Sequence, residues 1–66
     1  MNVDRKRLQL AMARACMRSS DLPTAARLPR ATVQNALSGK SVLPATLGKI
    51  AKALNVDPEE IIKMEE

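Results

Sequence analysis

Four prolines constrain this 66-residue chain more than any other feature, because a helix tolerates proline only within its first turn. They stand at positions 23, 29, 44 and 58, and between them apolar residues recur at helical spacing. No stretch shows the alternation of apolar and polar residues that is typical of a strand. The prolines therefore predict an all-α fold in which short helices follow one another, the helices after the first each beginning at or near a proline.

Other start and stop signals refine this division. The segment Asp57-Pro58-Glu59-Glu60 combines an N-cap residue, a proline at the first helical position and an acid three residues after the cap. Gly39 is well placed as the left-handed residue that ends a helix. We expect five short helices: from Val3 to about Met17, from Ser20 or Asp21 to near Arg27, from Arg30 to Ser38, from Pro44 to near Asn55, and from Pro58 through Ile61, Ile62 and Met64.

The length and composition fit one small domain spanning residues 1–66. Hydrophobic residues make up 45% of the chain and none is aromatic, so the core must consist of aliphatic side chains, Met and many Ala. We expect Leu22, Val33 and Leu37 in this core. No apolar run approaches the roughly 20 residues of a membrane-spanning helix, and no secretory signal is recognisable. We therefore expect a cytoplasmic protein without a membrane partner, and the initial Met and acidic end favour a complete chain.

The reactive side chains are few. Cys16 is the single cysteine and the chain has no histidine, which excludes an internal disulfide and leaves Cys16 without the usual companions of a metal ligand or nucleophile. There is no glycine-rich phosphate loop and little chain for a deep substrate pocket. We therefore predict a protein that is not an enzyme, has no catalytic residue, metal or cofactor, and buries Cys16 as a small apolar residue.

The net charge of +4 is unevenly distributed: residues 1–18 carry +4, residues 19–44 carry +2 and residues 45–66 carry −2. Such asymmetry suits a polyanionic partner on one face, although a solvated basic helix would look similar. We interpret Arg5, Lys6 and Arg7 as a solvated helix start in preference to phosphate contacts.

Two expected helices joined by a turn of about three or four residues have the outline of a helix-turn-helix. The residues themselves carry a closer likeness. The chain resembles the Cro and phage-repressor (XRE-like) helix-turn-helix family in two segments, DLPTAARLPRATVQNALSGK and LPATLGKIAKALNVDPEEII. The resemblance implies a lambda-repressor-like, all-α DNA-binding domain whose third helix enters the major groove while the second lies across the backbone.

The resemblance also implies roles for individual residues. Arg30 suits bidentate pairing with guanine, Asn35 or Gln34 with adenine, and the Ala31 methyl suits contact with a thymine methyl. The base-contact candidates are Arg30, Ala31, Gln34 and Asn35, and the DNA-backbone candidates are Ser19, Ser20, Thr32 and Lys40.

Two residues depart from the family pattern. Pro23 stands where the family usually has Ala, which implies a later start for the second helix. Arg27 stands where the family usually has Gly in the turn. It must either accept a positive φ or sit in a turn of different shape.

The sequence thus predicts a sequence-specific regulator of transcription, a repressor of phage or mobile-element type. Its partner is double-stranded DNA, bound as a homodimer, and we expect weak self-association through the C-terminal part. Ile62 and Met64 in this part either close the core or form an apolar patch for a second copy. The alternative is a protein-interaction module, antitoxin-like or adaptor, whose protein partner binds the fifth helix or the Val42-Leu43 loop. DNA binding should weaken steeply with salt and protein binding much less.

Overall fold

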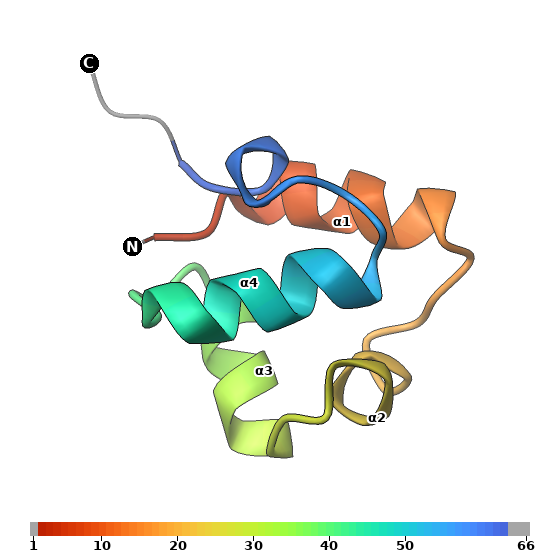
Figure 1. Ribbon diagram of the computed structural model, residues 1–66, viewed down its shortest axis with the longest axis horizontal. Helices are drawn as coiled ribbons and strands as arrows, with labels where there is room; N and C mark the ends of the chain where they lie inside the picture. Colours follow the sequence, from red (N-terminus) through yellow and green to blue (C-terminus); the bar gives the residue numbers. More distant parts are fainter. Residues whose placement is uncertain (1, 64–66) are drawn as a thin grey trace.

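The computed structural model describes residues 2–63 and is all-helical, with four α-helices and one short 3-10 helix in this part of the chain. In Figure 1, α4 crosses the middle of the molecule, α1 lies above it, and α2 and α3 lie below. The helix α4 packs against both α2 and η1, and α3 packs against both α1 and α2. The elements in chain order are α1 (Arg5–Arg14), α2 (Leu22–Ala26), α3 (Arg30–Leu37), α4 (Pro44–Ala53) and η1 (Pro58–Glu60).

A single aliphatic core joins these elements, and no described polar or charged residue is buried in it. Leu22 and Val33 are buried as predicted, whereas Leu37 is half-buried at the edge of the core. Every element, or the residue directly after it, contributes to the centre. The largest fully buried side chains are Leu8, Leu22, Val33, Leu47, Ile50 and Ile61.

All four α-helices end in the same way, with a residue in the left-handed conformation that reverses the chain direction. The next residue donates its N–H to a carbonyl oxygen five residues earlier, at 2.9 to 3.0 Å, which is the Schellman arrangement. Only one of the four left-handed residues is glycine. They are Cys16 (φ 55°), Arg27 (φ 56°), Gly39 (φ 81°) and Asn55 (φ 57°).

This geometry corrects the prediction for Cys16, which is exposed instead of buried. As the left-handed residue, Cys16 ends the helix and faces solvent, while the following Met17 packs against the core. Leu28 and Val56 pack in the same way after Arg27 and Asn55. An apolar contact by the residue after the left-handed one commonly accompanies this motif. It also explains why α1 ends at Arg14, before the predicted Met17.

The helix starts follow the local signals in the sequence. The Asp4 carboxylate accepts the Arg7 backbone N–H at 3.1 Å and so caps α1. Pro44 opens α4, and Pro23 lies in the first turn of α2, which begins one residue before it. Pro29 is the residue before α3, with extended angles of φ −60° and ψ 147°. The helix α2 thus begins one or two residues after the predicted start at Ser20 or Asp21.

The predicted fifth helix is wrong in extent. Its start is as expected, because Asp57 and Glu60 form a capping box in which the Asp57 N–H donates to the Glu60 carboxylate at 2.9 Å. The helix is a single 3-10 turn, and Ile62 lies in an extended segment. Met64 lies outside the described residues.

The chain stops being helical there because its backbone finds partners at the other end of the protein. The Asp4 N–H donates to the Ile61 carbonyl oxygen at 2.8 Å, and the Lys63 N–H donates to the Asn2 carbonyl oxygen at 2.8 Å. Isolated bridges join Val3 to Ile62 and Asn2 to Ser41. The same pairing moves the start of α1 from the predicted Val3 to Arg5. Among residues 2–63, no helix has the length and apolar character needed to cross a membrane.

Candidate nucleic-acid interface

The turn between α2 and α3 consists of Arg27, Leu28 and Pro29. The Arg27 N–H donates to the Thr24 carbonyl oxygen at 3.3 Å, and the Leu28 N–H donates to the Pro23 carbonyl oxygen at 3.0 Å. Arg27 adopts left-handed angles of φ 56° and ψ 47°, which decides between the two possibilities left open by the sequence. Leu28 packs against the core, so the turn holds α2 and α3 in a fixed relation.

The helix α3 has one buried face and one open face. Val33 and Ala36 are buried at 1% and 0% exposure, which anchors the helix against the core. The open face carries every residue that the sequence nominated for base contact. These four exposed residues are Arg30, Ala31, Gln34 and Asn35.

The nominated backbone contacts are less uniform. Ser19, Ser20 and Lys40 are exposed, whereas Thr32 is half-buried in the first turn of α3. The Thr32 backbone N–H donates to the Pro29 carbonyl oxygen at 3.1 Å, a hydrogen bond that closes the first turn of α3. Of the four backbone candidates, Thr32 therefore offers the least surface to a partner.

A shallow hollow of about 210 Å³ brings part of this set together between the start of α2 and the side of α3. Ser19 and Ser20 form one side, Arg30 and Gln34 the other, and Pro23 with half-buried Leu37 adds apolar surface. The other nominated residues lie outside the hollow. Those residues are Ala31, Thr32, Asn35 and Lys40.

Lys40 lies at the opposite end of α3 from Arg30. Its backbone N–H donates to the Asn35 carbonyl oxygen at 3.0 Å, which places it directly after the last helical turn. Neither Arg30 nor Lys40 forms an ion pair with an acidic residue within residues 2–63. Both ends of α3 therefore carry an uncompensated positive charge.

Asp21, the acid nearest to the interface in sequence, forms its hydrogen bonds with Arg18. Its carboxylate accepts the Arg18 backbone N–H at 3.0 Å and the Arg18 Nε–H at 3.4 Å. The backbone hydrogen bond, with smaller contributions from the Arg18 side chain, holds the pKa of Asp21 below its ordinary value of 3.8. Asp21 thus stays ionised at neutral pH and compensates Arg18 in place of Arg30.

The exposed polar groups on α3 can act as hydrogen-bond donors and acceptors toward base edges, and those near the α2 start suit phosphate oxygens. Comparison with known proteins agrees with this geometry. The family model described as Cro/C1-type HTH DNA-binding domain matches residues 7–66. No curated protein and no solved structure gives a match. The chain therefore belongs to the Cro/C1-type helix-turn-helix DNA-binding domain family.

Proposed function

We propose that this protein is a sequence-specific regulator of transcription that binds double-stranded DNA by inserting α3 into the major groove. The observation that carries the proposal is the open face of α3, where four polar or small residues stand exposed on a helix anchored by Val33 and Ala36. We further propose a repressor of bacterial or phage type that acts in the cytoplasm by occupying its operator.

Each nominated side chain has a task in this arrangement. The Arg30 guanidinium donates two hydrogen bonds to the O6 and N7 atoms of a guanine, and the Asn35 or Gln34 amide pairs with an adenine. The Ala31 methyl contacts a thymine methyl. Ser19 and Ser20 hold the start of α2 against a phosphate, and Lys40 contacts the backbone beyond the end of α3.

We also propose that two copies bind one operator. Half-sites in such operators are about one helical turn apart, roughly 34 to 36 Å. Weak self-association through the C-terminal part involves half-buried Ile62, whereas Ile61 is fully buried and contributes nothing to such a surface.

The test combines operator selection from random duplexes with binding measurements on Arg30→Ala. Loss of one bidentate base contact should weaken binding by about 1 to 3 kcal/mol, or roughly 5- to 150-fold, and relax base preference at one position. Lys52→Ala removes the same charge from the exposed surface of α4 and serves as the control. If Arg30→Ala and Lys52→Ala bind alike, or if α3 amide signals stay unchanged when a duplex is added, the proposal fails.

The protein-interaction alternative keeps one specific feature. Leu43 is 73% exposed in the loop before α4, so its apolar side chain is accessible to a partner. Its neighbour Val42 is buried, so the loop offers less apolar surface than the sequence suggested. If this alternative holds, Leu43→Ser will abolish capture of a protein partner, and binding will depend weakly on salt.

A further inference from the structure

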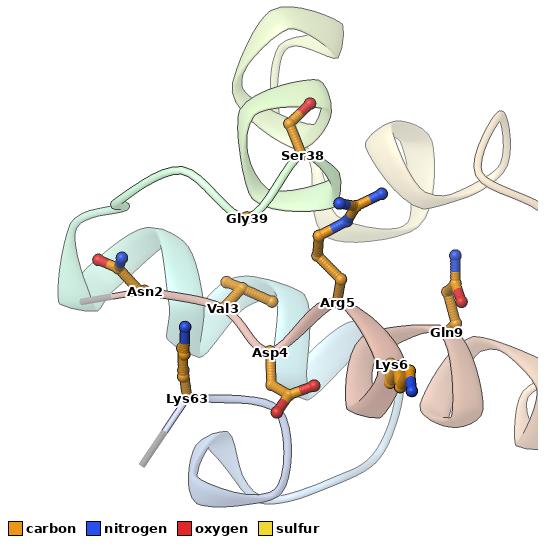
Figure 2. Close-up of a pocket in the computed structure, with 9 residues that line it drawn as sticks. All are labelled: Asn2, Val3, Asp4, Arg5, Lys6, Gln9, Ser38, Gly39 and Lys63. Atoms are coloured by element: carbon orange, nitrogen blue, oxygen red, sulfur yellow. The ribbon is translucent and has the colours of Figure 1, made fainter. Parts of the chain in front are cut away.

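A second hollow, of about 570 Å³, lies where the N-terminal segment meets the end of α3 and Lys63 (Figure 2). Its cationic side chains come from both ends of the chain: Arg5 and Lys6 from the start of α1, and Lys63 from the segment after η1. Ser38 and Gly39, just after α3, form another side. We call this feature the terminal basic hollow.

Backbone pairing between the two ends of the chain builds the hollow. The Lys63 N–H donates to the Asn2 carbonyl oxygen at 2.8 Å, and the Asp4 N–H donates to the Ile61 carbonyl oxygen at 2.8 Å. These bonds bring Lys63 close to Arg5 and Lys6 despite more than 50 residues of intervening sequence. The gathering of positive charge is therefore a product of the fold.

Arg5 is held at the end of α3 by Gly39. A Cβ atom on Gly39 would lie 3.1 Å from Arg5 Cδ and 3.3 Å from Arg5 Cγ, so the aliphatic part of Arg5 packs where a side chain would otherwise stand. Figure 2 shows the guanidinium rising from α1 toward the last turn of α3, beside Ser38. Arg5 thus presents its charge next to α3.

Among the residues that the structure describes, the cationic side chains of the terminal basic hollow have no acidic partner. Within residues 2–63, none of Arg5, Lys6 and Lys63 forms an ion pair with an acidic side chain. Among residues 2–63, Asp4 is the one acid that lines the hollow. Its carboxylate accepts the Arg7 N–H at 3.1 Å and lies 3.9 Å from Arg7 Nε. All three cationic residues are exposed, so the hollow suits an anionic partner.

The position of the hollow on α3 indicates which anion it would meet. The eight residues of α3 span about 12 Å, which is close to the roughly 12 Å width of the major groove. When Arg30 at the start of α3 faces the bases, the other end of the helix comes near a sugar-phosphate strand at the groove edge. Ser38, directly after this end of α3, lines the terminal basic hollow. Leu37, the last residue of α3, lines the smaller hollow that contains Arg30.

We propose that the terminal basic hollow binds phosphate groups of the same duplex that α3 reads, with Lys6 and Lys63 as direct contacts and Arg5 beside them. This inference rests on the proposed function and extends its footprint. Arg5 and Lys6 precede the segment matched by the family model, which begins at residue 7. The structure also separates Arg7, which is paired with Asp4, from Arg5 and Lys6, which the sequence alone grouped with it.

The test compares two double variants of equal charge. Lys6→Gln/Lys63→Gln removes charge from the hollow, and Lys49→Gln/Lys52→Gln removes the same charge from α4. Binding to the selected operator is followed by fluorescence anisotropy between about 50 and about 200 mM salt, where each phosphate contact contributes about 0.9 to the slope of log K against log salt. We expect the hollow variant to lower this slope by about 1 to 2 relative to the control variant.

Equal slopes for the two double variants would overturn the inference while leaving the proposed function intact, because the wild-type protein would still bind and Arg30→Ala would still weaken binding. If the wild-type protein binds no duplex, the proposed function fails and this inference with it. A second measurement needs no variant: the amide signals of Lys6, Gly39 and Lys63 in the wild-type protein should shift when the operator is added and return as salt rises. Unshifted signals in a bound complex would also overturn the inference.

Discussion

Replacing Arg27 by glycine should stabilise the protein, even though it removes a complete side chain. Arg27 holds left-handed angles of φ 56° and ψ 47° at the end of α2. Its side chain is exposed and makes no ion pair with an acid in the described part of the chain. The change therefore removes steric strain from the backbone and little else.

The size of the effect follows from two opposing contributions. The left-handed conformation of a residue with a Cβ atom costs about 1 to 2 kcal/mol, and glycine avoids this cost. Glycine also gives the unfolded chain more freedom, which offsets about 0.5 to 1 kcal/mol. The free energy of unfolding should therefore rise by up to about 1.5 kcal/mol, with a central value of about 0.75 kcal/mol that corresponds to a Tm increase of roughly 3 to 6 °C for a domain of this size.

The measurement is thermal unfolding followed by circular dichroism, supported by urea unfolding with an unchanged m-value. Arg27→Ala is the matched control, because it removes the same charge and keeps the Cβ atom that causes the strain. The alanine variant should unfold close to the wild-type temperature, below the glycine variant. If Arg27→Gly unfolds at or below the temperature of Arg27→Ala, strain at this position does not govern stability.

Three further outcomes are expected. Gly39→Ala should lose about 1 to 2 kcal/mol of stability, because φ is 81° and the new Cβ would press on Arg5 at 3.1 Å, and an unchanged Tm would contradict this. Ile61→Ala should lower the free energy of unfolding in urea by about 2 to 4 kcal/mol, because the Ile61 side chain is fully buried. Ile62 is half-buried, so an equal loss in Ile62→Ala would refute the assigned packing. The pKa of Asp21 in the folded protein, measured by carboxyl NMR titration, should lie below 3.8 because the Arg18 N–H stabilises the ionised form. The stability that Asp21 contributes is therefore present above its unfolded pKa and is lost as pH falls through the lower folded pKa. A measured pKa of 3.8 or higher for Asp21 in the folded protein would contradict this prediction.

The positions of the four α-helices follow from short-range signals in the sequence. Proline fixes its own φ and lacks an N–H, so Pro23 and Pro44 fit only in a first turn whatever surrounds them. The Asp4 cap and the Asp57–Glu60 capping box depend on residues three apart. Such features are readable because they involve only neighbours in the chain.

The left-handed helix ends were only partly readable. Gly39 was predicted because glycine favours positive φ, whereas Cys16 has no such preference and was placed in the core. A usable signal existed, since an apolar residue follows Cys16, Arg27 and Asn55 and packs against the core in each case. The pattern of a helix followed by one solvent-facing residue and one apolar residue indicates this type of helix end.

For the candidate site, the sequence specified which face of α3 is open. The spacing of Val33 and Ala36 fixes the buried face, and exposure of Arg30 and Gln34 follows from the helical period. Whether Ser19 and Ser20 lie beside Arg30 depends on the turn at Arg27 and on how α2 packs against α3. The sequence alone left the shape of that turn open.

The sequence by itself thus determined the helical class, the starts of α3, α4 and η1, the open face of α3 and the family, because these depend on local conformational preferences and on residue patterns. Only the tertiary structure decided the conformation of the C-terminal segment and brought Lys63 into the same hollow as Arg5 and Lys6. Residues 61–63 form no fifth α-helix because their backbone groups bond to residues 2–4 at the opposite end of the chain. Whether these backbone groups bond within a local helix or to a distant segment depends on the energy of the complete fold, and local sequence patterns do not encode that energy.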